Sequence, residues 1–433
     1  MFGLPKFGDG ICLSRIADFY DALEIDTEAL SRRSIVVTGT NGKGSTARFI
    51  ASALEATGLR VGCFTSPHLF DVRERFLVGE EMISRADFDD YAGAVLRHNV
   101  ALPDRDRMGA FEVLFLMAVL WFEREAPDAI VWEAGIGGRY DPVRTVRARV
   151  SALTSIELEH TELLGATEEL IAYDKTDALA PGGTLVLSPG IPPALADRIA
   201  RYASLSSKRA IRPADRVGGA RNTLDGAVFA WRDEARDIPV QLRLIGRHQI
   251  DNAVTAAQTA ACWLENDDPL RVDRLPPDSW PVLLGGLGQV RWPGRLERVA
   301  SGPDLWIDVG HTPNAVDLVT AAFLDVVPRE RTLIVFGVSA SKDIRWIAAI
   351  VASRFDRFIL TRARKSGADV SAYADIFDGL DATIEPDIVR AAGLARARAS
   401  RDGLTVLAIG GLFLAAEFQH AWSGGDPDAL AFL

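Results

Sequence analysis

The sequence is poor in cysteine, lysine and histidine. Its 433 residues include three cysteines, six lysines and six histidines. Cys12, Cys63 and Cys262 are odd in number, far apart and set in apolar sequence, which excludes a disulfide framework and a Cys-x-x-Cys metal site. We therefore expect three buried thiols. Arginine supplies nearly all of the positive charge, so the position of each lysine is informative.

A basic surface and a long apolar run are also missing. The chain has 59 acidic and 48 basic residues, a formal charge of −11. Nucleic acids and anionic membranes bind basic surfaces, so we predict neither as a partner. The most apolar helical run, residues 111–122, is too short to span a bilayer and contains Glu112, and no signal-peptide pattern opens the chain. We expect a cytoplasmic monomer.

The pattern of the chain favours an α/β fold. The length suggests two or three domains, and a composition of 48% hydrophobic and 25% charged residues is typical of a globular protein. Short β-branched runs alternate with helical patterns, which is typical of a mostly parallel sheet covered by helices. Residues 192–240 have a weaker pattern that could hold a small antiparallel piece. The first half is predicted to contain strands 35–38, 61–65, 129–133, 150–156 and 185–188 and helices 48–57, 112–124 and 168–179.

A second alternation begins after a segment rich in glycine and proline, residues 285–293. We place a domain boundary near residue 299, giving a P-loop-type ATPase domain over 1–298 and a smaller Rossmann-like α/β domain over 299–433. The segment Gly285-Gly-Leu-Gly288 lacks the strand and acidic residue of a dinucleotide fingerprint and is predicted to be a loop. The second domain is predicted to contain strands 305–308, 332–336, 358–360 and 405–409 and helices 314–326, 346–353 and 386–398.

A glycine-rich turn joins the first strand to the first helix. It reads Gly39-Thr-Asn-Gly-Lys-Gly-Ser-Thr46. Glycines let backbone N–H groups approach phosphate oxygens, the helix N-terminus favours anions, and Lys43 can neutralise a β- or γ-phosphate. Gly44 separates Lys43 from Ser45, so the strict P-loop pattern is not met. The alternative is a tight turn without a ligand, which would bear the conformational cost of its glycines for no gain.

Two further polar groups follow strands of the same predicted sheet. Glu133 closes strand 129–133 and precedes Gly135-Ile-Gly-Gly138, a place that suits a Mg²⁺ ligand. His160 stands just past strand 150–156, where it could be a second metal ligand or orient a phosphoryl group. A single histidine is more often structural, and the two neighbouring candidate groups favour the functional interpretation.

The glycine-rich turn is the first of a long series of motifs in order along the chain. Together they resemble the folylpolyglutamate synthase and dihydrofolate synthase branch of the Mur ligase superfamily, over nearly the whole sequence. The other motifs are Leu13-Ser-Arg-Ile16, Thr65-Ser-Pro-His-Leu69, Arg73-Glu-Arg75, Phe111-Glu112, Glu133-Ala-Gly-Ile-Gly-Gly-Arg139, Thr154-Ser-Ile-Glu-Leu-Glu-His160, Asp174-Lys175, Gly246-Arg-His-Gln249, Asn252-Ala253, Pro293-Gly-Arg-Leu-Glu297, Asp308-Val-Gly-His311, Lys342-Asp343 and Ala408-Ile-Gly-Gly-Leu-Phe-Leu414.

The resemblance implies an ATP-dependent amide ligase. In that family ATP phosphorylates a substrate carboxylate, and the amine of an amino acid attacks the acyl phosphate to give an amide, ADP and phosphate. Lys43 would then clamp the γ-phosphate. The resemblance places ATP against Gly39, Thr40, Asn41, Gly42, Lys43, Gly44, Ser45, Thr46, Asn252, Arg295 and Asp308.

The resemblance also implies metal ions and a modified lysine. Ser66 and Glu133, with Ser45, would hold one Mg²⁺, and Glu133 and His160 would hold a second. Lys175 corresponds to the lysine that is carbamylated in this family; the alternative is a plain surface lysine on a helix. His311 would lie near the incoming amino acid, which in this family is glutamate.

The sequence departs from the family where substrates are bound. Gly109 stands in place of a threonine just before Phe111, and Asp141-Pro-Val-Arg144 replaces Asp-Ala-Thr-Asn; these segments line the dihydropterin pocket of bifunctional members. Phe111 and Asp141 are therefore candidate substrate residues. Thr312 and Gly411 replace an asparagine and a serine around the amino-acid site, and such losses change discrimination between substrates. Glu159-His160 replaces Asp-His, a conservative change.

Three hypotheses follow. The leading one is a folylpolyglutamate-synthase-like ligase that joins glutamate to a folate-type carboxylate. The second keeps the chemistry but uses a non-folate carboxylate or a different amino acid, as in cofactor or secondary-metabolite biosynthesis. The third is a phosphate-binding protein without ligase activity, which the presence of Glu133, His160 and Lys175 disfavours.

Overall fold

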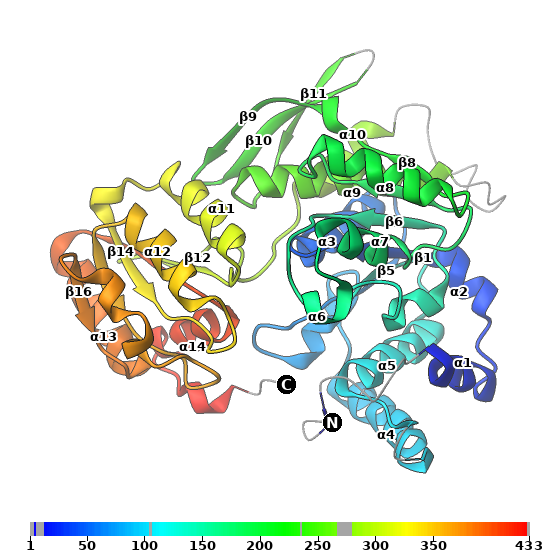
Figure 1. The fold of residues 1–433 in the computed structure, drawn as a ribbon, viewed down its shortest axis with the longest axis horizontal. Helices are drawn as coiled ribbons and strands as arrows, with labels where there is room; N and C mark the ends of the chain where they lie inside the picture. Colours follow the sequence, from blue (N-terminus) through cyan, green and yellow to red (C-terminus); the bar gives the residue numbers. More distant parts are fainter. Residues whose placement is uncertain (1–3, 6–12, 104–105, 234–235, 266–278, 431–433) are drawn as a thin grey trace.

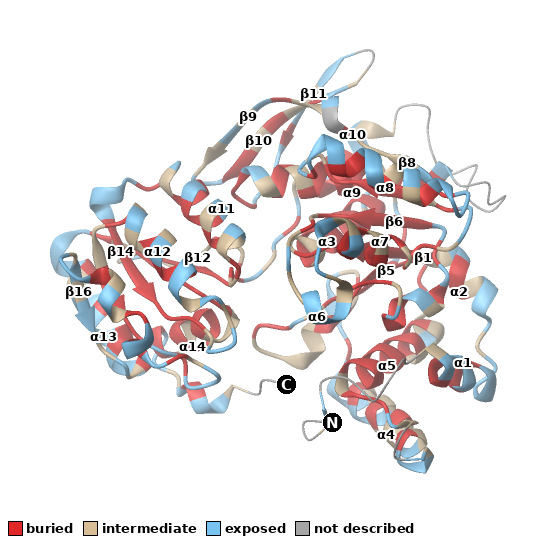
Figure 2. Ribbon diagram, viewed as in Figure 1, coloured by how far each residue is buried: buried red, intermediate tan, exposed pale blue. Residues whose placement is uncertain are grey.

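The described part of the chain folds around two large sheets and a small third one, as expected for an α/β protein (Figure 1). The structure is a computed structural model that describes residues 4–5, 13–103, 106–233, 236–265 and 279–430. An eight-stranded sheet lies in the N-terminal part and a six-stranded sheet in the C-terminal part. The strands of both sheets are largely buried, with exposed residues mainly on the outer faces of the helices (Figure 2).

The N-terminal sheet is mostly parallel, in the order β4-β3-β2-β5-β1-β6-β7-β8. Only the β2–β3 and β3–β4 pairs are antiparallel. The carboxyl ends of the parallel strands therefore meet at one edge, where open α/β sheets bind ligands. The strands are β1 Ser34–Thr38, β2 Val61–Phe64, β3 Phe76–Val78, β4 Glu81–Met82, β5 Ala129–Glu133, β6 Val150–Leu153, β7 Thr184–Leu187 and β8 Arg209–Ile211.

Helices cover both faces of this sheet. On one face, α3 (Lys43–Glu55), α9 (Arg247–Glu265) and α10 (Trp280–Leu287) share an apolar core with β1 and β2. The opposite face packs against α5 (Ala110–Glu125), and most residues of this helix are buried. The other helices of this part are α1 Leu13–Ala22, α2 Thr27–Arg33, α4 Arg85–Ala101, α6 Thr161–Leu164, α7 Glu168–Thr176 and α8 Pro193–Ser204.

Residues 192–240, whose sequence pattern is weak, contain the small antiparallel sheet that the sequence analysis allowed. Strands β9 (Val217–Thr223), β10 (Gly226–Arg232) and β11 (Asp237–Gln241) form a three-stranded sheet in the order β11-β10-β9. This sheet lies over α9 and α10 (Figure 1), with the rings of Trp231 and Trp280 4.5 Å apart between them.

The C-terminal sheet is doubly wound, as predicted. Its order is β12-β13-β17-β14-β15-β16, and only β12 runs antiparallel to its neighbour. Helices α11 (Pro313–Leu324) and α12 (Ile344–Arg354) pack on one face, and α13 (Ile388–Asp402) and α14 (Leu412–Trp422) on the other. The division near residue 299 stays a prediction. The strands are β12 Glu297–Ala300, β13 Leu305–Asp308, β14 Thr332–Phe336, β15 Arg357–Leu360, β16 Asp381–Ile384 and β17 Thr405–Ile409.

Several helices differ from their predicted bounds, and two differences bear on the site and its packing. Helix α3 begins at Lys43 rather than at residue 48, because Gly42 adopts a left-handed φ of 82° at its N-cap and starts the helix there. The segment around Gly285 and Gly286, predicted as a loop, lies inside α10. A Cβ on Gly286 would stand 2.4 Å from the carbonyl oxygen of Ser52, so this glycine serves the close packing of α10 on α3.

Cys63 and Cys262 are buried free thiols, as predicted, and Cys12 lies outside the described residues. Among the helices that the structure describes, none is both long enough and apolar enough to cross a bilayer.

Candidate active site

The glycine-rich turn lies between the end of β6 and the start of α9. A Cβ on Gly39 would stand 1.9 Å from Thr154 Oγ1, and one on Gly42 would stand 2.5 Å from Asn252 Oδ1. Both glycines have positive φ angles, 143° and 82°. The turn therefore needs glycine at these two positions. Asn252 lies beside the turn, and its role in ATP binding stays a prediction.

Hydrogen bonds with Thr154 and Ser155, the two residues that follow β6, stabilise the conformation of the turn. The amide of Thr40 donates to Ser155 O and the amide of Asn41 donates to Ser155 Oγ, both at 2.8 Å. Thr154 Oγ1 donates to Asn41 O at 2.5 Å. Helix α3 has no side-chain cap at Gly42, so its positive N-terminal end faces the site. Thr46 Oγ1 is buried in this first turn without a hydrogen-bond partner in the described structure.

Lys43 and Lys175 meet at one carbonyl group. Lys43 Nζ donates to Gly39 O and Thr40 O, and Lys175 Nζ donates to Gly39 O, all at 3.0 Å. Lys175 is only 5% exposed, which contradicts the alternative of a plain surface lysine. Burial, together with the positive charge of Lys43, lowers the pKa of Lys175 to about 7.

Glu133 lies at the end of β5, beside the first turn of α3. Its Oε2 accepts a hydrogen bond from the Ser66 amide at 2.8 Å and would be 3.3 Å from a Cβ on Gly44. Burial raises the pKa of Glu133, while the charges of Lys43 and Arg295 oppose this shift. The structure thus brings Glu133, Ser66 and the helix start together, as the metal prediction requires.

His160 stands at the N-cap of α6 with a positive φ of 52°. Its Nε2 is 4.0 Å from Glu159 Oε1. Among the described residues there is no group of three or more histidine, cysteine, aspartate or glutamate side chains placed to hold a metal ion. A metal at Glu133 or His160 would therefore take further ligands from a substrate or from water, and the metal assignment stays a prediction.

The C-terminal sheet contributes Asp308 from the end of β13. Asp308 accepts hydrogen bonds from the amides of Leu296 (2.8 Å) and Gly310 (2.6 Å). Burial raises its pKa to about 6, and the nearby charge of Arg295 opposes the shift. Arg295 also acts electrostatically on Glu133, so this arginine joins the two halves of the site.

His311 lies beside Gly411 at the same sheet edge. Its Nδ1 is 3.1 Å from Val309 O, and burial together with the charge of Lys342 lowers its pKa to about 4. A Cβ on Gly411 would be 3.9 Å from His311 Cβ. Thr312 caps α11 by accepting the Ala315 amide at 3.2 Å. The predicted amino-acid residues are therefore close together, around a neutral imidazole.

Three contacts across the two halves were not predicted. Glu157 Oε1 accepts a hydrogen bond from Asn41 Nδ2 in the turn and another from Asn314 Nδ2 in α11, each at 2.8 Å. Asn41 Nδ2 also lies 3.3 Å from Thr312 Oγ1, and Lys342 Nζ lies 3.3 Å from Glu159 Oε1. The only sequence signal was the position of Glu157 inside the motif that ends at His160.

Asp141 organises the loop after β5. Its two oxygens accept hydrogen bonds from the amides of Gly135 and Ile136 (2.9 Å each) and Val143 (3.0 Å), and burial raises its pKa to about 6. Phe111 packs against the same loop, since a Cβ on Gly135 would be 2.7 Å from its ring. A substrate role for Phe111 and Asp141 stays a prediction.

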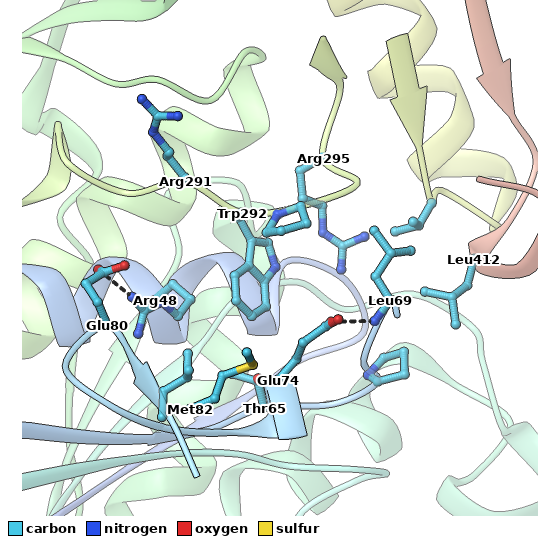
Figure 3. Close-up of a pocket in the computed structure, with 14 residues that line it drawn as sticks. Arg48, Thr65, Leu69, Glu74, Glu80, Met82, Arg291, Trp292, Arg295 and Leu412 are labelled. Atoms are coloured by element: carbon cyan, nitrogen blue, oxygen red, sulfur yellow. Dashed lines mark hydrogen bonds and ion pairs between the residues drawn. The ribbon is translucent and has the colours of Figure 1, made fainter. Parts of the chain in front are cut away.

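A cavity of about 270 Å³ opens beside these groups on the α3 side (Figure 3). Its walls come from α3, from residues 65–82 and from residues 291–295, together with Val309 after β13 and Leu412 of α14. Of its lining residues, sequence reasoning had singled out Arg295 as a site residue and missed Arg48 and Trp292, because the walls are assembled from distant segments.

Comparisons with known proteins identify the family. Residues 294–412 match the family model described as Mur ligase, glutamate ligase domain. The chain is 31% identical to folylpolyglutamate synthase of Lacticaseibacillus casei over 340 residues, which covers 76% of each chain. It is also 31% identical to dihydrofolate synthase/folylpolyglutamate synthase of Bacillus subtilis, covering 72% of this chain and 71% of that one. The chain belongs to the folylpolyglutamate synthase/dihydrofolate synthase family.

Other members of this family show how far the likeness extends. A probable bifunctional folylpolyglutamate synthase/dihydropteroate synthase of Halobacterium salinarum is 32% identical over 401 residues. That match covers 90% of this chain and 47% of the relative, so the chain spans about half the length of that protein. The structure of Mycobacterium tuberculosis folylpolyglutamate synthase complexed with ADP and AMPPCP superposes with a TM-score of 0.83 at 25% identity, covering 97% and 96% of the two chains. The family resemblance and the fold expected from the sequence are confirmed.

Proposed function

We propose that this protein is an ATP-dependent, ADP-forming amide ligase that joins the amine of glutamate to a folate-type carboxylate. The observation that carries the proposal is that Lys43, Lys175 and Glu133 lie together at one glycine-rich turn, while Arg295 acts on both Glu133 and Asp308. Membership of the family and its likeness to a structure complexed with ADP and AMPPCP support it.

In the first step an oxygen of the acceptor carboxylate attacks the γ-phosphorus of ATP, and ADP leaves. Lys43 would release the carbonyls of Gly39 and Thr40 and bind the transferring phosphoryl group, whose charge it stabilises. The buried, unpartnered hydroxyl of Thr46 and the uncapped end of α3 fit phosphate oxygens. Asn252, Arg295 and Asp308 would hold the rest of the nucleotide.

In the second step the amine attacks the acyl carbon, phosphate leaves, and an amide forms with loss of a proton. His311 is neutral and directs Nδ1 toward Val309 O, which leaves Nε2 as an acceptor for the amine N–H. Thr312 and Gly411 would border the amino acid. The acceptor and the amino acid would thus meet between the two large sheets, where Glu157 links the glycine-rich turn to α11.

A Mg²⁺ ion fits Glu133 and Ser66. Mg²⁺ is usually held by one or two carboxylates together with phosphate oxygens and water, and Glu133 is a buried carboxylate with a single backbone donor beside the phosphate turn. The ion would supply charge neutralisation at the phosphates. Ser45 and His160 would complete its surroundings.

Lys175 fits carbamylation. A lysine amine reacts with CO₂ in its neutral form, losing a proton to give a carbamate, and a pKa of about 7 keeps much of Lys175 neutral near neutral pH. The carbamate would replace a second cation beside Lys43 with an anion, which removes the repulsion at Gly39.

A substrate panel tests the proposal. The purified protein is incubated with ATP and Mg²⁺ while tetrahydrofolate, dihydropteroate and unrelated carboxylates are crossed with glutamate and other amino acids, and phosphate release and product mass are measured. A folate product with added glutamate would support the proposal. Turnover only with another pair would favour the second hypothesis, which the changes at Thr312 and Gly411 motivate, and no ADP formation with any pair would favour a phosphate-binding protein.

A further inference from the structure

A second cavity, of about 590 Å³, lies in the C-terminal part of the chain and shares no lining residue with the cavity in Figure 3. Its walls come from residues 362–367, which follow β15, and from residues 386–390, which run from the end of β16 into α13. Strands β13, β17, β14, β15 and β16 are parallel, so the cavity lies at the same sheet edge as Asp308 but on other strands. Open α/β sheets bind ligands at this edge.

Arginine dominates the lining of this cavity. Arg362, Arg364 and Arg390 supply three positive charges against one carboxylate, that of Asp387. Arg390 is already paired, since its Nε and Nη2 donate to Glu385 Oε1 at 3.2 and 3.0 Å. The carboxylate of Asp387 is also in use, because its Oδ1 accepts the Arg390 amide at 2.8 Å and caps α13. Arg362 and Arg364 are therefore the groups left to bind an anion.

Both of these arginines keep free the edge of the guanidinium that binds carboxylates and phosphates. The side chain of Arg362 donates through Nη1 alone, to Asp369 at 3.4 Å. The side chain of Arg364 also donates through Nη1 alone, to Asp426 at 2.9 Å and Asp428 at 2.6 Å. Nothing in the described part of the chain pairs with Nε or Nη2 of either side chain. These two nitrogens form the fork that holds two oxygens of one anionic group.

The carboxylates that contact Nη1 are exposed to solvent. The side chains of Asp369, Asp426 and Asp428 are 68%, 69% and 68% exposed. Exposed ion pairs contribute little, because water competes for both partners. These contacts therefore leave Arg362 and Arg364 available to a ligand inside the cavity.

The backbone that carries the two arginines is held in place before any ligand binds. The amides of Arg364 and Lys365 donate to the buried carboxylate of Glu417 in α14, at 2.6 and 2.9 Å. Gly367 closes the turn tightly, since a Cβ on it would stand 2.3 Å from Ala363 O. A ligand would thus meet a preorganised turn, which lowers the entropy lost on binding.

We infer that this cavity binds a small hydrophilic organic anion with at least two carboxylate or phosphate groups, one for each free arginine fork. Its volume lies in the range of small-molecule sites, about 300–1,000 Å³, and exceeds what a single inorganic ion would fill. The apolar side chains in its lining are those of Ala363, Pro386 and Ile388, so a large flat apolar body has little surface to contact. The site is separate from the glycine-rich turn, and the inference does not depend on the proposed ligation.

Isothermal titration calorimetry of the full chain, without ATP or substrates, tests this inference. The probes are citrate and fructose 1,6-bisphosphate, each at one fixed ionic strength because exposed charges are screened by salt. Arg362→Gln and Arg364→Gln each remove one fork, and Asp428→Asn removes a competing carboxylate. Arg345→Gln is the matched control, since Arg345 is an exposed arginine of α12 that pairs with Asp375 at 2.8 Å and does not line the cavity.

We expect one equivalent of at least one probe to bind. Arg362→Gln and Arg364→Gln should each raise its Kd at least about tenfold, because a charge-assisted pair is lost. Asp428→Asn should lower the Kd about two- to fivefold, and Arg345→Gln should change it less than about twofold. Tighter binding of citrate would assign carboxylate groups to the ligand, and tighter binding of fructose 1,6-bisphosphate would assign phosphate groups.

Failure of both probes to bind would overturn the inference, and so would an Arg345→Gln effect as large as that of Arg364→Gln. Lys43→Ala detects a probe that binds at the glycine-rich turn instead, and loss of binding in that variant would also overturn it. If Arg364→Gln does not fold, Arg362→Gln and the surface variant Asp428→Asn carry the comparison, and an unchanged Kd in both would reject the cavity as the site.

Discussion

Lys43 and Lys175 both donate to the carbonyl oxygen of Gly39, so two lysine amines are held close together. Two protonated amines at this distance would repel each other, and buried charges lose hydration. Burial and this repulsion together lower the pKa of Lys175, and the phosphate binding that we propose for Lys43 would offset the repulsion.

The first prediction concerns Lys43, the proposed ligand of the phosphoryl group, and His160, a proposed metal ligand. We expect Lys43→Ala and His160→Ala each to abolish turnover, a fall of at least about 100-fold in kcat, because the transferring phosphoryl group loses a charge partner or a metal ligand. Steady-state rates of ADP formation measure the effect, with Lys365→Ala, whose side chain is exposed on a loop, as the control. Ligation near the unmodified rate by either variant would refute the site assignment.

The second prediction concerns the pH dependence of Lys175. Its folded-state pKa of about 7 lies below the ordinary 10.5, so the amine is mostly neutral above pH 7 and mostly protonated below it. Carbamylation should therefore be strong at pH 8 and weak at pH 6. We expect a carbamate signal in ¹³C NMR with labelled bicarbonate at pH 8, its loss in Lys175→Arg, and activation of CO₂-depleted protein by bicarbonate at pH 8.

Lys208→Arg provides the control for that experiment, because Lys208 is also a buried lysine but pairs with Asp177 at 3.3 Å. A carbamate signal that persists in Lys175→Arg, or a bicarbonate effect that is stronger at pH 6 than at pH 8, would contradict the prediction.

At the scale of elements, three helix N-termini lie at or near the site. Helix α3 begins after Gly42 and α14 after Gly411, both without a side-chain cap, while α11 begins after Thr312. Uncapped N-termini leave backbone N–H groups and a positive partial charge for an anionic ligand. Glycine at two of these caps therefore makes room for substrate groups where a serine or threonine would satisfy the helix itself.

The third prediction concerns the packing of α10 on α3. Gly286→Ala would place a Cβ 2.4 Å from the backbone oxygen of Ser52, so one helix must move, and we expect a loss of about 1–3 kcal/mol in the free energy of unfolding. Gly285→Ala, in the same helix, meets nothing within 4 Å and should be neutral or stabilising by up to about 1 kcal/mol. Urea denaturation compares them; equal effects of the two substitutions would contradict the packing argument.

At the scale of the whole molecule, Glu157 connects the glycine-rich turn to helix α11 of the C-terminal part. One oxygen of this carboxylate accepts hydrogen bonds from both Asn41 and Asn314, and Asn314 belongs to the first turn of α11. Because the proposed nucleotide contacts come from both halves, we expect closure of the two halves to be part of the proposed reaction.

The fourth prediction tests this connection. Glu157→Ala removes two hydrogen bonds to a charged group, which we expect to cost about 1.4 kcal/mol and thus about tenfold in kcat/KM for ATP. Small-angle scattering should show a larger radius of gyration for the variant. Glu162→Ala, exposed on α6, is the control. A variant with unchanged scattering and unchanged kinetics would show that Glu157 does not join the halves.

Local sequence determined the elements that are buried on both faces and the turn between them. Strands β5, β13, β14 and β17 have the predicted bounds, because a parallel strand covered by helices reads as an unbroken apolar run. The edge strand β16, with its sequence Asp-Ala-Thr-Ile, was missed, because it is largely exposed and lacks such a run. The phosphate turn was found because its glycines are required by the local backbone.

Tertiary structure alone decided the depth of Lys175, the connection through Glu157 and the cavity beside Trp292. The pKa of Lys175 depends on desolvation by the segments that pack around it. The periodicity of the local sequence does not show which segments these are. Asn41 and Thr312 are 271 residues apart in sequence, yet their side chains lie 3.3 Å apart. The residue types at the site were thus determined by the sequence, and the distances, burial and charges that give them their chemistry were determined by packing between the two sheets.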